Sequence, residues 1–427
     1  MGLRTFLLVS AWLVACLVWA GTATRAQRSG MFMGSATDPG IAYFSGSFDN
    51  AVERLNQRLD AGAVRLAFDG RSGYLRSALD AIGLSIDSQV LVFSRASLQR
   101  RLIGPANPRA IFFNDYAALG WVRDGDLIEV AAHDATKGIV FYTLEQQEVE
   151  APRFRRVTLC LGCHMNGETL GVPGLLMFSS LPESDQGPAS ATFMNHSMPV
   201  ERRFGGWFVT GGVTPLNHRG NGVAALAGRS RALTSTTGLY DADAYLSNTS
   251  DIAALLVLTH QANTVNGMIR AGWEARSIDP ALHPGTPPGS EVLHAPVLRA
   301  LAADVVDSLL FIDEAPLAGR VQSASGFGER FAAVGPSDSK GRSLRQLDLT
   351  RRLMTYPCSY LIYSPVFDAL PASMKTMIYE RLWQVLSGAE TDVRYQRALT
   401  LADRQAIVEI LSETKPGLPD YFRPITK

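Results

Sequence analysis

The pentapeptide CLGCH occupies residues 160–164, close to the point where the character of the sequence changes. Before about residue 150, short apolar or aromatic runs of strand length follow amphipathic helical patterns. Beyond residue 151, the chain carries helical patterns separated by long stretches rich in glycine, proline and serine. We therefore predict an α+β protein. Residues 27–150 form a mixed α/β region with a small sheet, and residues 151–427 form a mainly helical region.

The patterns before residue 150 are regular enough to predict individual elements. Apolar residues recur at helical spacing in residues 47–62 and 72–83, and each run ends on a glycine. Asp124-Gly125 joins two strand-like runs in the manner of a tight hairpin. The expected strands are residues 89–94, 109–115, 117–122, 126–132 and 139–146.

Beyond residue 151 the main signals are helical. One helix is expected from Asp251 to Arg270, and it is apolar on nearly all sides at its start, so it should be buried. A second pattern, at residues 290–311, is predicted to be interrupted by Pro296. Two further helices are expected at residues 374–388 and 400–413.

Residues 1–26 have the pattern of a secretory signal peptide. A short segment with one arginine precedes an apolar run from Phe6 to Ala20, and small residues lead to Ala26, where we expect cleavage. An uncleaved anchor is an alternative, although the run is shorter than the roughly 20 residues that span a bilayer. Another alternative is a lipobox ending at Cys16, which would make the protein a lipoprotein. Each reading predicts export to the periplasm or beyond, with membrane contact only through a lipid or an N-terminal anchor.

The charge balance predicts no nucleic-acid partner. Lys and Arg together number 40, as do Asp and Glu, so the net charge is zero and no global field attracts a polyanion. Basic pairs are scattered along the chain rather than clustered. A partner would have to be recognised by a local patch.

Export to an oxidising compartment raises the question of how the cysteines are used. Without Cys16 the chain has Cys160, Cys163 and Cys358. A redox pair of the thioredoxin type would follow a strand in a βαβ unit and needs no histidine, and a zinc site would need a second ligand pair. A disulfide between residues three apart is strained. The thioredoxin reading therefore leaves the histidine unexplained, and the chain has no other Cys-x-x-Cys to complete a zinc site.

Cys-x-x-Cys-His is the attachment signature of c-type haem, and in this respect the chain resembles the c-type cytochromes. The resemblance covers only the motif and the stretch that follows it. It implies that Cys160 and Cys163 form thioethers to a haem and that His164 is an axial ligand of the iron. It also implies that the mainly helical residues 151–427 are a cytochrome c-like, haem-binding domain. The motif occurs once, so one covalent haem c is expected.

The other axial position then needs a ligand, and the stretch FMNHSMPVERR, residues 193–203, offers two. Met198 is the first choice, because it precedes a proline, as does the distal methionine of many small cytochromes. His196 is the second choice, and an ordinary loop or core role remains open for both. His218 could be a ligand, a propionate partner or a solvated side chain.

Haem also carries two propionates, which need hydrogen-bond donors. Arg202, Arg203 and Trp207 follow the candidate ligand stretch, and an arginine fork or an indole N–H suits a carboxylate. The alternative is that the two arginines are solvated.

The resemblance implies an exported monohaem cytochrome that transfers electrons to or from a partner protein in the cell envelope. A simple carrier needs only about 100 residues, a single small domain, whereas this chain has 427. One alternative is therefore a haem peroxidase or oxygenase, with His260 or Arg203 near an open distal site. Another is a haem-bearing docking subunit of an envelope redox complex. We leave open at this point whether the protein is an enzyme.

Overall fold

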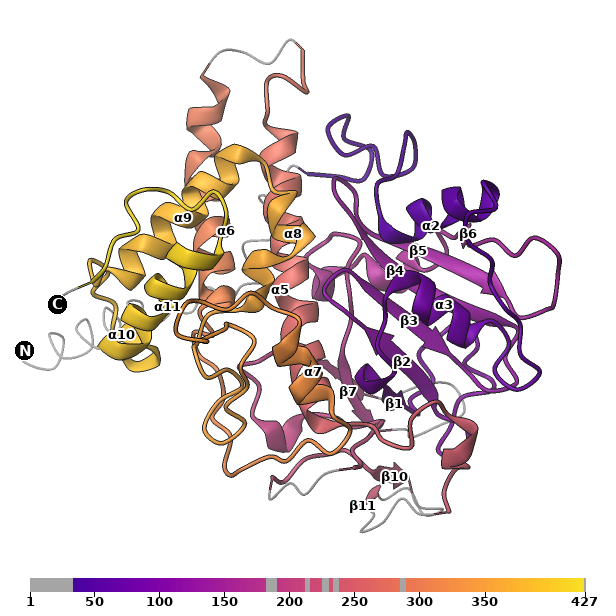
Figure 1. Ribbon diagram of the computed structural model, residues 1–427. Helices are drawn as coiled ribbons and strands as arrows, with labels where there is room; N and C mark the ends of the chain where they lie inside the picture. The colour runs from indigo at the N-terminus through magenta and orange to yellow at the C-terminus, as the bar shows by residue number, and fades with distance from the viewer. Residues whose placement is uncertain are drawn as a thin grey trace, which may run out of the picture.

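The computed structural model describes residues 34–181, 190–211, 216–224, 230–232, 238–284 and 289–425. The expected signal peptide and Cys16 lie outside the described residues. The described chain has an α+β fold, as the sequence predicts. In Figure 1 a sheet, coloured indigo to magenta, stands beside a body of helices coloured orange to yellow.

In the described part of the chain, seven antiparallel strands form the main sheet, in the order β6-β5-β4-β3-β2-β1-β9. The five strands predicted from the sequence are confirmed as β1 to β5. A turn at Asp124, where φ is 60°, joins β3 to β4, and the N–H of Gly125 donates to the Val122 carbonyl at 3.1 Å. The connection spans residues 122–126, so it is longer than the expected tight hairpin. The bounds are Val90–Val92 (β1), Arg109–Phe113 (β2), Ala117–Trp121 (β3), Leu127–Asp134 (β4), Gly138–Glu145 (β5), Arg155–Arg156 (β6) and Trp207–Phe208 (β9).

Helices α2, Ala51–Asp60, and α3, Leu75–Ile82, cover one face of the sheet (Figure 1). The Asn50 side chain caps α2 by accepting two backbone N–H groups of the first turn. Gly83 ends α3 in the left-handed conformation, which only glycine adopts without strain. Each helix buries its apolar side. Both predicted helices are confirmed.

The second half of the fold is built on α5, Ile252–Ser277, which is buried along nearly its whole length. Helix α6 packs against α5 and α9, and α11 packs against α9. The predicted helices of this region are therefore confirmed. The remaining bounds are Ser290–Leu309 (α6), Phe327–Ala333 (α7), Pro365–Asp368 (α8), Ala372–Leu386 (α9), Val393–Ala398 (α10) and Leu401–Thr414 (α11).

The predicted interruption at Pro296 is wrong, because α6 continues through this residue. Proline removes one backbone N–H and crowds the carbonyl four residues earlier, here that of Val292. Val292 and Leu293 are exposed, so water can bond the carbonyl that the helix leaves free. The apolar residues that follow hold the rest of the helix in the core.

The sheet draws strands from both sides of residue 150. Strands β6 and β9 lie beyond that residue, and β9 pairs with the edge strand β1 through Leu91↔Phe208 and Val92↔Trp207. The buried apolar residues of the sheet and of the helices form one continuous core. The division of the chain into two domains near residue 150 stays a prediction.

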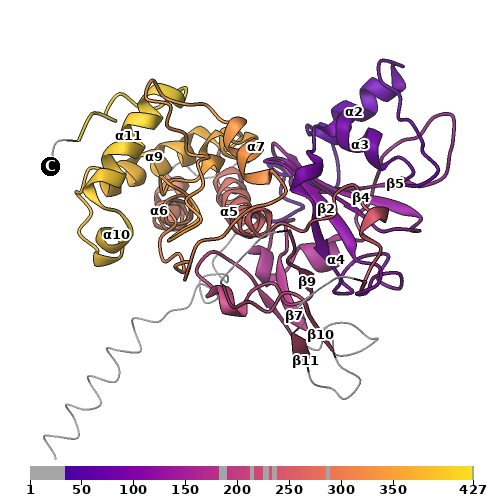
Figure 2. The same cartoon turned by 60° about the horizontal axis from the view of Figure 1, so that its bottom comes forward.

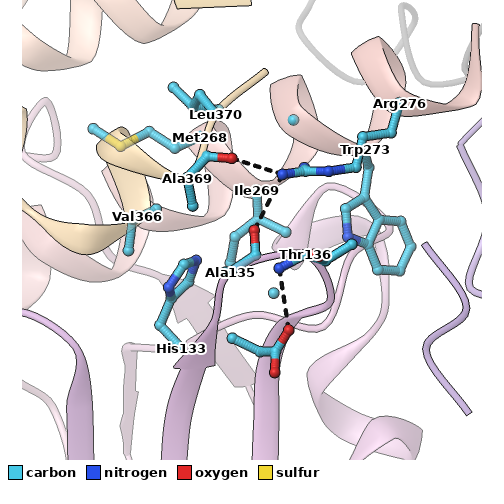
Figure 3. Close-up of a pocket in the computed structure, with 13 residues that line it drawn as sticks. His133, Ala135, Thr136, Met268, Ile269, Trp273, Arg276, Val366, Ala369 and Leu370 are labelled. Atoms are coloured by element: carbon cyan, nitrogen blue, oxygen red, sulfur yellow. Dashed lines mark hydrogen bonds between the residues drawn. The ribbon is translucent and has the colours of Figure 1, made fainter. Parts of the chain in front are cut away.

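A small pocket marks the junction between the sheet and the helical body (Figure 3). It lies between the β4–β5 turn, α5 and α8. Arg276 of α5 donates to the carbonyls of Ala135, at 3.1 Å, and Ala369, at 2.6 Å, and so ties the turn to the end of α8. Burial, with Arg276 nearby, lowers the pKa of His133 in this junction to about 3.

Two small hairpins complete the described strands. Strands β7, Phe178–Leu181, and β8, Ser190–Phe193, form one, and β10, Gly222–Ala224, and β11, Ser230–Ala232, form the other. Within the described ranges, no helix combines the length and the apolar character that a membrane span requires.

Candidate haem site

Cys163 and His164 lie on α4, Leu161–His164, a single helical turn that follows strand β6, and Cys160 is the residue just before it. The N–H groups of Cys163 and His164 both donate to the carbonyl of Cys160, at 3.1 and 2.9 Å. The two cysteines are therefore held on one turn, as the spacing predicts. Both thiols are free, with Cys160 half-buried and Cys163 exposed.

Two hydrogen bonds to Gly174 fix the orientation of His164. The imidazole Nδ1 lies 2.9 Å from the Gly174 carbonyl, and the N–H of Gly174 donates to the carbonyl of His164, also at 2.9 Å. A carbonyl only accepts, so Nδ1 carries the proton and Nε2 keeps its lone pair. Burial lowers the pKa of His164, which favours the neutral ring. A neutral imidazole with a free Nε2 is the form that binds a metal.

Asparagine side chains secure the chain on both sides of the motif. Asn266 of α5 accepts the N–H of Leu175 and donates to its carbonyl, both at 2.8 Å. Asn56 of α2 makes the same pair of bonds to Phe154, at 3.1 and 3.0 Å. Both asparagines are buried, with 1% and 2% of their surface exposed. Each amide therefore acts like a short strand partner for the segment that contains the motif.

We use the term motif face for the face of the sheet that carries Phe141, whose ring lies 4.8 Å from that of His164. In Figure 2, α2 and α3 lie above the sheet and α4 lies below it. Side chains alternate along a strand, so the pairs Ala131↔Phe141 and Gly120↔Glu129 place Glu129 and Gly120 on the motif face. The pair Ile111↔Gly120 places Arg109 there as well.

Arg109 and Glu129 form an ion pair on the motif face, with 3.1 Å between Nη2 and Oε2. Sequence reasoning missed both residues. A partial signal was present, because each is a charged residue within an apolar run of strand length. The strand register was also needed to bring them together.

Comparisons with protein-family profiles, with curated proteins and with solved structures found no match. The site is therefore interpreted from its own residues. These fit a covalently bound haem, because both thiols are unpaired on one helical turn and the imidazole offers Nε2. Among the described residues, no group of three or more His, Cys, Asp and Glu side chains is arranged to hold a metal ion.

Of the two distal candidates, His196 is the one whose side chain already makes ring contacts and a hydrogen bond in the core. Its ring lies 5.5 Å from that of His260 and 5.9 Å from that of Phe311, and its Nε2 is 3.1 Å from the carbonyl of Ile312. Met198 is partly buried and packs against the core through its side chain. Met198 stays the first choice, because its sulfur is not used in a hydrogen bond of the described structure.

Two of the three propionate candidates have donors that are already engaged. Arg203 is buried and donates to the carbonyls of His196 and Met198, both at 2.7 Å. The indole N–H of Trp207 donates to the carbonyl of Phe178 at 2.8 Å. Arg202 is exposed. Arg203 thus holds the candidate ligand loop together, and the propionate role stays a prediction for all three.

The two other histidines considered in the sequence lie in different settings. His260 is fully buried, its ring stacks on Phe311 at 4.0 Å, and its Nε2 is 2.7 Å from Ser359 Oγ. This is the environment of a hydrogen-bonded core histidine. His218 is partly exposed and its ring lies 6.4 Å from that of Phe204.

The three free cysteines among the described residues should react with iodoacetamide in a defined order in protein prepared without haem. Burial, followed by the charge of Glu129, raises the pKa of Cys160 to about 11, so roughly a thousandth of it is thiolate at pH 8. We expect Cys163, which is exposed, to react first and Cys160 much more slowly. Cys358 is buried and has a pKa of about 12, so it should react only on unfolding. Time-resolved peptide mass spectrometry measures the three rates, and equal rates for Cys160 and Cys163 would contradict the described burial.

Proposed function

We propose that the protein is an exported monohaem c-type cytochrome that transfers electrons to or from a partner protein in the cell envelope. The observation that carries the proposal is the His164–Gly174 hydrogen bond, which leaves Nε2 free beside two unpaired thiols. When bound, haem supplies a one-electron couple at its iron. Cys160 and Cys163 would hold the haem covalently, and the Nε2 of His164 would bind its iron.

The surroundings of the motif support the electron-transfer role. Cys163 is exposed and Leu159 is 75% exposed, so one side of α4 faces solvent. The other side rests on the sheet through Phe141, and Asn56 and Asn266 hold the chain at Phe154, before the motif, and at Leu175, after it. An electron carrier needs this combination, because a rigid ligand set limits reorganisation and an accessible edge lets the partner approach.

Production in cells equipped for cytochrome maturation tests the proposal. The wild-type protein should be red, gain the mass of one haem and show the pyridine haemochrome spectrum of two thioether bonds. The double variant with Cys160→Ala and Cys163→Ala should lack the covalent mass, whereas Cys358→Ala should keep it. A colourless wild-type protein without the added mass would contradict the proposal.

The distal ligand separates the carrier from the alternative of a haem peroxidase or oxygenase. If Met198 is the ligand, the ferric wild-type protein should be low-spin, and Met198→Ala should convert it to high-spin. His196→Ala then leaves the spin state unchanged. Visible and electron paramagnetic resonance spectra measure both. A high-spin wild-type protein that reacts rapidly with peroxide would favour the enzyme instead.

A further inference from the structure

The Arg109–Glu129 ion pair is a charged and mostly buried feature of the motif face. The two side chains are only 18% and 12% exposed. Glu129 also accepts hydrogen bonds from Ser97 Oγ, at 2.8 Å, and from the N–H of Leu98, at 3.2 Å. Three donors thus surround the carboxylate and fix its position.

Arg109 is positioned by the backbone beneath it. A Cβ atom at Gly120 would overlap the guanidinium of Arg109, so the group lies directly on the middle strand of the sheet. Its Nε is buried and has no hydrogen-bond partner among the described residues. The position of the cation is therefore set by contact with Gly120 and by the ion pair with Glu129.

The pair lies beside the motif. Glu129 is two residues from Ala131 on β4, and Ala131 pairs with Phe141, whose ring lies 4.8 Å from that of His164. The motif face around the pair is only partly covered, because Ile111, Ala118 and Ala131 keep intermediate exposure. The charges of Arg109 and Glu129 would therefore act electrostatically on the iron of a haem attached to α4.

We propose that Arg109 and Glu129 are a fixed pair of opposite charges that sets the reduction potential of the iron bound by His164. The inference rests on the proposed function. Reduction adds an electron, so a nearby cation favours the reduced state and a nearby anion favours the oxidised state. Arg109 raises the potential and Glu129 lowers it. The pair is poorly screened by salt because both groups are mostly buried.

The test is the equilibrium between the haem-loaded protein and a redox dye of known potential, followed by absorption. Arg109→Gln should lower the equilibrium constant for reduction by roughly threefold to tenfold, and Glu129→Gln should raise it by a similar factor. Tenfold corresponds to about 59 mV for one electron. The double variant should return towards wild type, and Arg109→Lys should stay close to it because the charge is kept.

The Arg352–Asp403 pair provides a matched control. It has an N–O distance of 2.6 Å and side-chain exposures of 20% and 13%, and it links α11 to the loop that precedes Thr355. Helix α11 lies on the opposite side of the molecule from α4 (Figure 2). Arg352→Gln should change the equilibrium constant by less than about twofold. An equal shift in this control would overturn the inference, since the effect would then not be specific to the motif face.

The outcomes also separate this inference from the proposed function. Wild-type protein without covalent haem overturns the proposed function and the inference with it. Haem-loaded protein in which Glu129→Gln leaves the potential unchanged, or lowers it, overturns only the inference. Gln keeps the shape of Glu and can still bond Ser97 or Leu98. The Glu129→Gln variant therefore tests the effect of the pair on the reduction potential even if Arg109→Gln does not fold.

Discussion

Ferric protein with the substitution His164→Ala is expected to keep its covalent haem and to lose its low-spin spectrum completely. Attachment depends on Cys160 and Cys163, whereas the imidazole of His164 alone supplies the proximal nitrogen in the proposed site. Alanine leaves that axial position without a protein ligand. Visible and electron paramagnetic resonance spectra of the purified variant measure the loss.

Added imidazole should restore the low-spin spectrum of His164→Ala, because the space of the lost ring and the Gly174 carbonyl remain. His283→Ala is a matched control. The Nδ1 of His283 also lies near a backbone carbonyl, that of Asp279, at 3.0 Å, yet its removal should leave the spectrum unchanged. An unaltered spectrum in His164→Ala would show that the proximal ligand is wrongly assigned.

The substitution Asn266→Ala should cost about 2–5 kcal/mol of the free energy of unfolding, because it leaves the N–H and the carbonyl of Leu175 without their partner in the interior. Leu175 follows Gly174, the residue that orients His164. We therefore also expect a disturbed axial-ligand spectrum in the haem-loaded variant. Urea unfolding followed by circular dichroism measures the stability.

Two other asparagines allow the two effects to be separated. Asn56 holds Phe154, on the other side of the motif, and Asn221 holds Val209 by the same pair of bonds, at 2.7 and 2.9 Å. Each alanine variant should lose a comparable free energy. Only Asn266→Ala should alter the spectrum of the axial ligand. A stability loss without any spectral change in Asn266→Ala would contradict its role in positioning His164.

The elements that could be predicted from the sequence are those with a local cause. Helix α2 has a capping asparagine and an apolar side at helical spacing, and strands β3 and β4 are joined by an Asp-Gly turn. These signals lie within a few residues of the element that they specify. The prediction for Pro296 failed because the effect of a proline depends on solvent access to the freed carbonyl, which is not a local property.

Short strands that pair over long distances could not be predicted. Strand β9 has two residues and pairs with β1, which lies more than a hundred positions earlier in the chain. Two residues carry no usable periodicity, and pairing energy depends on a partner that the local sequence does not identify. The same reason applies to the Arg109–Glu129 pair, which exists only in the register of β2, β3 and β4.

The sequence by itself determined that two thiols and an imidazole occupy one short segment, because their spacing is a covalent property of the chain. Only the tertiary structure decided which imidazole nitrogen is free, since Gly174 reaches His164 through a loop closed against α5. It also decided which charges lie beside the motif. Hydrogen-bond direction and electrostatic range depend on distances in space, and folding creates these distances from residues far apart in the chain.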